Sequence, residues 1–361
     1  MNIYNHRDVI LLLNYLHFNN HRILSLANSN RLYHFIDSRE KQLMTLNFLT
    51  SNEIQKLLSI YSKFDMDKYK AQLYSRNINY STILDETFPE KLKNICNPPA
   101  VIFYKGKLDI IACAVAIVGS RKATEYGKWA TKKLVKELSR YDVTIVSGMA
   151  LGIDRCAHEE ALHNKLHTCG VLASSLDIEY PSSNSDLYKA MKGQLLISEF
   201  GLATEPLKRN FVSRNRIISA LSEAVIVVEA AEKSGSLITA NFAIEQGRDV
   251  YAVPSSIDSL TSAGCNELIK RGAKLISRGQ DIIEDIPYLK ELEKTRVDCI
   301  IADLSEEEKF ILSLLEDSIC SIEDLKIKSG YNFPALMQYI TRLEMKGYIE
   351  RIDSIHYTYL Y

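Results

Sequence analysis

Apolar positions between residues 114 and 253 form short, continuous, β-branched runs that alternate with amphipathic segments of helix length. Such runs are typical of parallel strands that are covered on both faces. The pattern predicts a Rossmann-like, doubly wound and mostly parallel α/β sheet. Its six strands are expected at residues 115–118, 144–147, 168–172, 195–197, 225–228 and 250–253.

The segment before this sheet has a different periodicity. Residues 1–75 carry apolar positions at helical spacing, with Ser51 and Asn52 as the cap of one helix. Three prolines at residues 89–99 then predict an irregular connector. We therefore expect an N-terminal helical domain at residues 1–75 and the sheet domain at residues 80–288.

The segment after the sheet predicts a third domain. A charged stretch at residues 290–296 is typical of a linker, and three helix candidates and an alternating, hairpin-like segment follow it. These four elements are expected at residues 304–315, 322–328, 333–346 and 348–359. Their order is that of a winged helix, so we expect a winged-helix domain at residues 300–361.

Composition narrows the class of protein without naming a ligand. The 361 residues suit two or three domains, and 46% hydrophobic with 25% charged residues is ordinary globular composition. The net charge of -1 means that any case for nucleic acid must depend on local basic clusters. The longest apolar run, residues 110–118, is far shorter than the roughly 20 residues of a membrane span, so we expect a cytoplasmic protein.

The seven cysteines are scattered and never spaced as C-x-x-C. This spacing fits neither a disulfide framework nor a zinc site. We therefore expect reduced thiols, no metal and no cofactor.

Turns whose residues are suited to binding an anion follow three of the predicted strands. In a parallel sheet, ligands bind where the carboxyl ends of strands meet helix N-termini with free N–H groups. Glycine and small hydroxyl residues let a backbone approach phosphate, and arginine can grip it with two hydrogen bonds. Each turn could also be an ordinary connection, but all three are expected at one edge of the sheet. Their candidate residues are Gly119, Ser120, Arg121, Ser147, Gly148, Lys233, Ser234, Gly235 and Ser236.

A basic segment at residues 206–222 holds no acidic residue and adds a fourth candidate. It contributes Lys208, Arg214, Asn215 and Arg216. Apolar neighbours such as Phe211 predict that the segment is anchored to the core while its basic groups point elsewhere, toward a nucleic-acid backbone. Two alternatives remain: a solvated helix face, or arginines that pair internally with Glu199 or Glu229 and brace the loops.

Sequence signatures of catalysis are weaker than those of anion binding. The sequence has neither G-x-G-x-x-G nor a P-loop, and Ser147 and Ser198 lack the G-x-S-x-G context of a nucleophile. Asp154 and His158 are one helical turn apart, but an aspartate at a helix start is normally a cap and a lone histidine is more often structural. We predict no catalytic residue.

Taken in order, several motifs resemble the DNA-processing protein A (DprA/Smf) family. They are Ile117-Val118-Gly119-Ser120-Arg121, Ser147-Gly148-Met149-Ala150-Leu151-Gly152-Ile153-Asp154, Tyr180-Pro181-x-x-Asn184, Ser198-Glu199, Arg214-Asn215-Arg216, Lys233-Ser234-Gly235-Ser236-Leu237-Ile238-Thr239-Ala240, Gln246-Gly247-Arg248 and Gly264-x-Asn266. The resemblance covers residues 80–286. It implies a protein, not known as an enzyme, that binds incoming single-stranded DNA during natural transformation, protects it and helps to load a RecA-type recombinase. It also implies a homodimer through the sheet domain, and DNA across the candidate loops, including Arg121, Lys208, Arg214, Arg216 and Lys233.

The flanks resemble the same family less sharply. The N-terminal helices suit its sterile-alpha-motif-like or helix-hairpin-helix extension, and the C-terminal domain suits its winged helix. Residues 304–361 carry six basic and ten acidic side chains, a balance of 6 - 10 = -4. This charge opposes a role in duplex binding and favours a protein contact.

Two other functions are weighed against DNA binding. Nucleotide phosphoribohydrolases share the Rossmann-like superfamily, but they use a P-G-G-x-G-T loop where Lys233-Ser234-Gly235-Ser236 lacks the double glycine. A winged-helix transcription regulator would need a basic third helix, and the candidate offers only Arg342 and Lys346 against Glu344.

Overall fold

The computed structural model describes residues 5–28, 59, 64–286, 288–289, 292, 304–315, 319–346, 348–353 and 355–359. The chain divides into two compact units, Met1–Val135 with Val143–Arg278 and Lys136–Asp142 with Gly279–Tyr361. The predicted cap at Ser51 and Asn52 and almost all of the predicted linker lie outside the described residues. The division into three domains stays a prediction.

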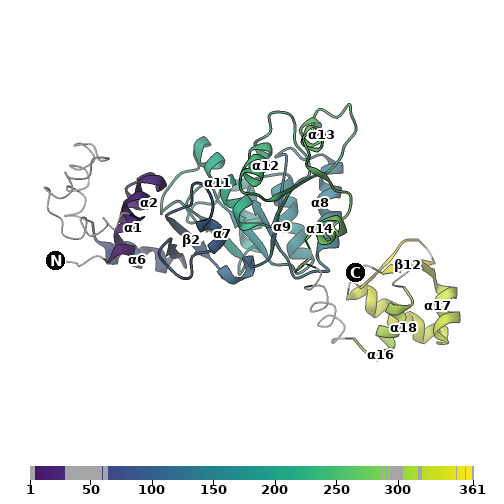
Figure 1. The fold of residues 1–361 in the computed structure, drawn as a ribbon. Coiled ribbons are helices and arrows are strands. Elements are labelled where there is room, and N and C mark those ends of the chain that lie inside the picture. The colour runs from purple at the N-terminus through teal and green to yellow at the C-terminus, as the bar shows by residue number, and fades with distance from the viewer. Residues whose placement is uncertain are drawn as a thin grey trace. The chain divides into compact units, whose positions relative to one another are not determined.

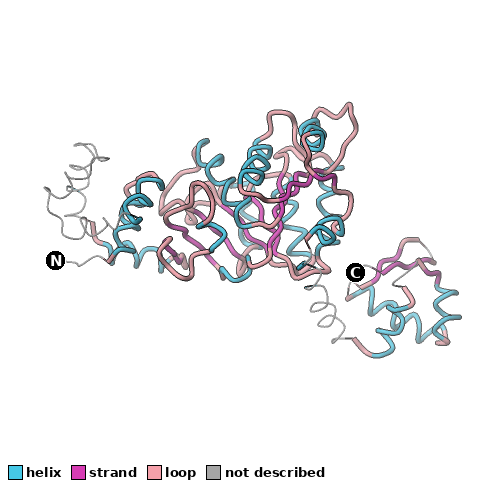
Figure 2. The backbone as a smooth tube through the Cα atoms, in the orientation of Figure 1, coloured by secondary structure: helices cyan, strands magenta, loops and turns pink. Residues whose placement is uncertain are grey.

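The first unit is built on a nine-stranded sheet with the order β1-β2-β6-β5-β4-β3-β7-β8-β9. Figure 1 shows the chain as a ribbon, and Figure 2 colours the strands magenta and the helices cyan. The strands of the sheet are β1 Asn79–Thr82, β2 Val101–Lys105, β3 Ala114–Val118, β4 Thr144–Gly148, β5 Thr168–Val171, β6 Leu195–Ser198, β7 Ala224–Val227, β8 Asp249–Ala252 and β9 Lys274–Leu275. All six predicted strands are present, with ends shifted by at most one residue. From β6 to β9 every neighbouring pair is parallel.

The antiparallel pair of strands β1 and β2 was not predicted. β2 pairs antiparallel with β6, so the parallel sheet gains an antiparallel edge. The surrounding prolines indicated an irregular connector, but they lie outside both strands, where they remove no ladder hydrogen bond.

Helices cover the sheet because its strands are apolar on both faces. Ala114, Ala116 and Val118 of β3 share a core with Ile217 and Ile218 of α11, so the alternate positions of β3 face the other layer. The helices after the strands are α8 Glu125–Leu138, α9 Ile153–His163, α10 Ser185–Ala190, α11 Lys208–Leu221, α12 Gly235–Glu245 and α13 Ala263–Lys270. This part of the chain also has short helices. They are α7 Glu90–Lys93, the 3-10 turns Leu108–Ile111 and Ser182–Asn184, and α14 Gln280–Asp285, which belongs to the second unit. The predicted doubly wound α/β fold is confirmed.

The described N-terminal helices are α1 His6–Tyr15, α2 Asn20–Asn28 and α6 Met66–Ser75. Leu12 and Leu73 from these helices belong to the same buried cluster as Phe103 of β2. Asn5 caps α1, because its side-chain oxygen accepts from the N–H of Asp8 at 2.9 Å. These described helices therefore pack on the β2 side of the sheet and share a buried cluster with it.

The second unit contains the expected helices and hairpin. The helices α16 Glu306–Ser313, α17 Ile322–Ser329 and α18 Phe333–Met345 share a core with a small sheet of order β10-β12-β11. Its strands are β10 Cys320–Ser321, β11 Ile349–Arg351 and β12 His356–Tyr359. Ser305 begins α16 with a capping box to Glu308.

Candidate functional site

A pocket of about 440 Å³ lies at the carboxyl edge of the sheet, where the ends of β3 and β7 meet α11 and the start of α12. This is the edge at which parallel sheets bind ligands. The predicted residues that line the pocket are Gly119, Ser120, Arg121, Arg214, Asn215, Lys233, Ser234, Gly235 and Ser236. The structure thus brings the first and third predicted turns together with the basic segment.

The turn after β3 is held in place by close backbone contacts. The N–H of Ile153 donates to the carbonyl of Ser120 at 3.1 Å. A side chain at Gly119 would lie 2.6 Å from the Ile153 side chain, so only glycine fits there. At the other end of the turn, the buried carboxylate of Glu229 accepts from the N–H and hydroxyl of Thr124 at 3.0 and 2.9 Å. These contacts hold Arg121 at the rim of the pocket.

The start of α12 forms the opposite wall. Ser234 caps the helix through the N–H of Ser236, and the amide of Asn215 on α11 donates to the carbonyl of Gly235 at 3.2 Å. Lys233, directly before the cap, is exposed. The first turn of the helix therefore offers backbone N–H groups and an ammonium group to an anion.

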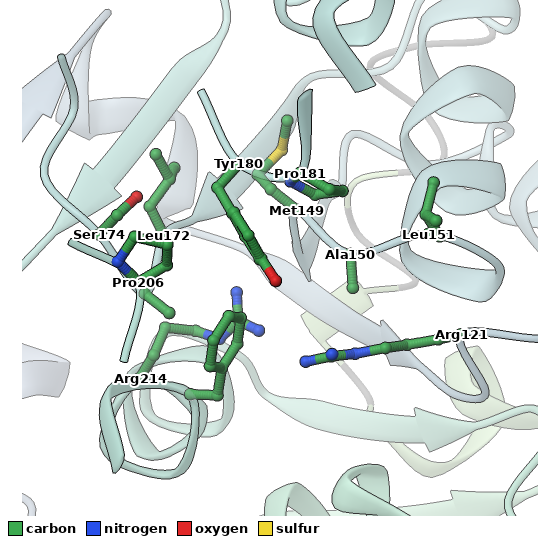
Figure 3. Close-up of a pocket in the computed structure, with 12 residues that line it drawn as sticks. Arg121, Met149, Ala150, Leu151, Leu172, Ser174, Tyr180, Pro181, Pro206 and Arg214 are labelled. Atoms are coloured by element: carbon green, nitrogen blue, oxygen red, sulfur yellow. The ribbon is translucent and has the colours of Figure 1, made fainter. Parts of the chain in front are cut away.

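An aromatic and cationic stack connects the two walls. The guanidinium carbons of Arg121 and Arg214 lie 4.9 and 5.9 Å from the ring centroid of Phe211, within cation–π range. The Tyr180 ring is 5.7 Å from the Phe211 ring. These four residues also line a smaller adjoining pocket of about 120 Å³, and in Figure 3 Arg121, Arg214 and Tyr180 point toward one another.

Arg214 is only 5% exposed and is held from within. Its guanidinium donates to the carbonyl of Val171 and, at 3.1 Å, to the side chain of Asn215. Burial lowers the pKa of Arg214 and raises that of buried Asp154, and the attraction between the two charges opposes both shifts. A side chain at Gly148 would lie 2.6 Å from the Arg214 guanidinium, so Gly148 makes room for it.

Arg216 points away from the pocket, contrary to the expectation that the basic groups of this segment leave the core. Its guanidinium pairs with Glu199, and each side chain is 5% exposed. Glu199 also accepts from Ser213 and from Asn20, both at 2.8 Å. The reason is helical geometry: residues two apart on a helix point in nearly opposite directions, so Arg214 and Arg216 cannot share one surface. For Arg216 the internal pairing with Glu199, kept above as an alternative, is the arrangement found.

Three further predicted residues lie outside the pocket lining: Ser147, Lys208 and Gly148, the glycine that makes room for Arg214. Ser147 is buried, and its hydroxyl donates to the carbonyl of Ile117 at 2.6 Å. Lys208 is exposed at the first position of α11 and does not line either pocket.

Residues 79–287 match the family described as DNA recombination-mediator protein A, and residues 300–353 match the DprA winged-helix domain. The chain belongs to the DNA recombination-mediator protein A (DprA) family. It is 43% identical to the DNA processing protein DprA of Streptococcus pneumoniae over 57% of this chain and 74% of that protein. It is 43% identical to the Bacillus subtilis protein of the same name over 65% of this chain and 79% of that protein.

Two solved DprA structures resemble this one. The Streptococcus pneumoniae structure covers 79% of this chain and 98% of its own, with a TM-score of 0.68 and 35% identity. The Helicobacter pylori structure covers 58% of this chain and 96% of its own, with a TM-score of 0.52 and 32% identity. The Helicobacter pylori protein binds single-stranded DNA.

In this DprA chain, the histidine that was weighed as an acid or base supports the fold. His158 is fully buried, with its ring nitrogens 2.6 Å from the Thr168 hydroxyl and 2.9 Å from the Gly148 carbonyl. Burial lowers its pKa to about 4, so it stays neutral at physiological pH. Within the part of the chain that the structure describes, no group of three or more His, Cys, Asp or Glu side chains is placed to hold a metal ion. Nor does any described helix have the length and hydropathy to cross a membrane.

Sequence reasoning missed the aromatic part of the DprA pocket. Phe211 was interpreted as an anchor to the core, but it is half-buried and lies within cation–π range of two arginines, and Tyr180 is 41% exposed beside it. The signal that could have found them is an aromatic residue within the basic segment and another directly before Pro181.

Proposed function

We propose that this chain binds single-stranded DNA across the carboxyl ends of β3 and β7. We further propose that it protects incoming DNA and promotes the loading of a RecA-type recombinase in natural transformation or recombination. One observation carries the binding proposal: a single pocket is lined by Arg121, Arg214, the N-terminus of α12 and Phe211, whose ring lies within cation–π range of both arginines.

The pocket suits both parts of a nucleotide. Arg121, Lys233 and the free N–H groups of α12 can bind phosphate oxygens without reading base edges. Tyr180, which is 41% exposed at the smaller pocket, presents a ring on which a base can stack, whatever its identity. Bases are accessible for stacking in a single strand and are paired within a duplex, so this combination favours single strands.

The remaining parts of the proposal concern partners. We propose that the chain acts in the cytoplasm as a homodimer through the sheet domain, and that the winged helix contacts a protein. The exposed edge strand β9 supports the dimer, since an uncovered strand edge is a place where another chain can pair. The acidic balance of residues 304–361 supports the protein contact.

Fluorescence anisotropy with labelled oligo-dT and with blunt duplex of equal length tests the binding proposal. We expect tighter binding to oligo-dT and a steep loss of affinity with added salt, because released counterions drive phosphate binding. Equal affinity for both DNAs, or indifference to salt, would contradict the proposal. Incubation with nucleoside monophosphates is the matching test for the phosphoribohydrolase alternative, and release of free base would support that enzyme instead.

A further inference from the structure

We propose that the outer face of α8 carries a second contact for single-stranded DNA, on which a base stacks beyond the pocket. We call this face, formed by Tyr126, Trp129 and Lys133, the α8 platform. The proposal deepens the function proposed above and depends on it.

The three side chains form one continuous surface. They lie at positions i, i+3 and i+7 of α8, which is the spacing of neighbours on one face of a helix. The rings of Tyr126 and Trp129 are stacked, with centroids 5.9 Å apart and planes inclined by 27°. The Lys133 ammonium lies 5.6 Å from the Trp129 ring centroid.

The platform is exposed and yet held in place. Trp129 is 57% exposed and Tyr126 is 44% exposed, although such large rings normally bury most of their surface. The Tyr126 hydroxyl donates to the carbonyl of Pro254 at 2.9 Å, and the Lys133 ammonium donates to the carbonyl of Ser277 at 3.1 Å. A ligand would therefore meet side chains that are already ordered, which lowers the entropic cost of binding.

The chemistry around the platform fits a nucleic acid strand. α8 carries four lysines and two glutamates, and Lys122 and Lys132 are exposed. A pocket of about 510 Å³ adjoins Tyr126 and is lined mainly by serine and threonine, including Ser255 and Ser259, whose hydroxyl groups can bond phosphates or bases. Lysine is depleted in protein–protein interfaces, whereas basic side chains beside aromatic rings are typical of single-strand sites.

The platform also continues the proposed DNA path. Arg121 lines the pocket from the connection between β3 and α8, and Tyr126 lies five positions further along the chain, in the first turn of α8. A strand that leaves the pocket past Arg121 can follow this connection to the outer face of α8. The platform would then contact DNA that is too long to end within the pocket.

Trp129 is the only tryptophan in the chain, so its fluorescence reports on the platform alone. Titration of the full-length protein with long oligo-dT should quench this fluorescence, and an oligonucleotide short enough to fill only the pocket should quench it much less. Anisotropy of labelled long oligo-dT then gives the affinity of each variant. For Trp129→Ala we expect about a tenfold loss or more, the usual scale for one stacked base. Trp129→Phe should keep most of the affinity, because its ring can still stack.

The matched control is Tyr74→Ala, which removes an 81% exposed aromatic side chain from α6. It should bind long oligo-dT like the unchanged protein, and circular dichroism should show that all three variants are folded. Unchanged affinity of Trp129→Ala, with no quenching of Trp129 in the parent protein, would overturn the platform while DNA binding at the pocket still stood. A parent protein that binds no single-stranded DNA would instead overturn the proposed function. A Trp129 signal that changes with protein concentration in the absence of DNA, together with a doubled mass, would assign the platform to a second copy of the chain.

Discussion

The two sides of α11 carry similar residues but differ in what those residues contact. On the pocket side, Phe211 and Arg214 lie beside Arg121 at the carboxyl edge of the sheet. On the inner side, Arg216 pairs with Glu199, which also binds Asn20 of α2. One helix therefore has a side that lines the pocket and a side that connects the sheet to the N-terminal helices.

This difference separates three arginines that are alike in composition. Arg121 is exposed, Arg214 is buried but lines the pocket, and Arg216 is buried and does not line it. Exposure and surroundings decide whether a charged group binds a ligand or stabilises the fold. We therefore expect a change at Arg216 to reduce mainly stability, a change at Arg214 to reduce both stability and DNA binding, and a change at Arg121 to reduce mainly DNA binding.

Arg216→Ala should have the largest effect on stability. Removing one partner of a buried ion pair leaves Glu199 charged and without its arginine, which typically costs about 3 to 5 kcal/mol. Urea unfolding followed by circular dichroism measures this loss. The double change Arg216→Met/Glu199→Leu should recover part of it, because no buried charge is then left alone. A loss below about 1 kcal/mol for the single change would contradict the inner-side role.

The layer beneath the pocket should make stability depend on pH through His158. Its pKa is about 4 in the folded chain and about 6.5 in an unfolded chain, so between these values the unfolded chain takes up a proton that the folded chain does not. Stability should be full above pH 6.5 and fall as pH falls toward 4, by about 3 kcal/mol from this group.

Buried Asp154, whose pKa is raised, titrates in the opposite sense, so a variant is needed to isolate the histidine. Urea unfolding of the parent and of His158→Gln at pH 7 and pH 5 provides the comparison. The parent should lose more stability than the variant over this interval. Equal losses would show that His158 does not control the pH dependence.

Arg214→Ala should combine both effects at intermediate size. The pocket loses a guanidinium beside Phe211, and buried Asp154 loses the positive charge that most strongly lowers its pKa. We expect about 2 kcal/mol less stability, on the scale of a lost charged hydrogen bond, and about tenfold weaker binding to oligo-dT. Unfolding and anisotropy must be measured on the same preparation. A variant that loses only one of the two properties would place Arg214 with Arg121 or with Arg216.

Deleting residues 300–361 should have the smallest effect on DNA affinity. This part of the chain is acidic, so it adds little attraction to phosphate. We expect oligo-dT affinity to change by less than about threefold, which is under 1 kcal/mol. A large loss, with the shortened protein still folded by circular dichroism, would show that the winged helix contributes to DNA binding.

The sequence predicted the sheet well because its strands are local apolar runs, as at residues 114–118 and 224–228. It placed the first and third turns at one edge of the sheet because each follows a strand of the predicted parallel sheet, and residues of both turns line the same pocket. Phosphate binding by these turns stays a prediction. The antiparallel strands β1 and β2 were missed, since the pairing of β2 with β6 brings together residues that are far apart in the chain. Pairing over such distances leaves no periodic signal.

The inward direction of Arg216 was beyond the reach of composition alone. Its partner Glu199 lies 17 residues away and directly follows strand β6. The sequence analysis expected both Arg214 and Arg216 to point toward DNA, although residues two apart on a helix point in nearly opposite directions. That geometric signal was available in the sequence and was not used. Phe211 was expected to anchor the segment to the core, and its contacts with Arg121 and Arg214 were not predicted. An aromatic residue that packs on a core and one that contacts arginines look alike in a sequence.

The most direct test of the account is the oligo-dT affinity of Arg121→Ala, measured by anisotropy alongside its melting temperature. We predict about tenfold weaker binding with unchanged melting, because the exposed guanidinium binds phosphate and fills no core. The matched control is Arg76→Ala, which removes an exposed arginine from the end of α6 and should alter neither property. Unchanged affinity of the Arg121 variant would contradict DNA binding at this pocket.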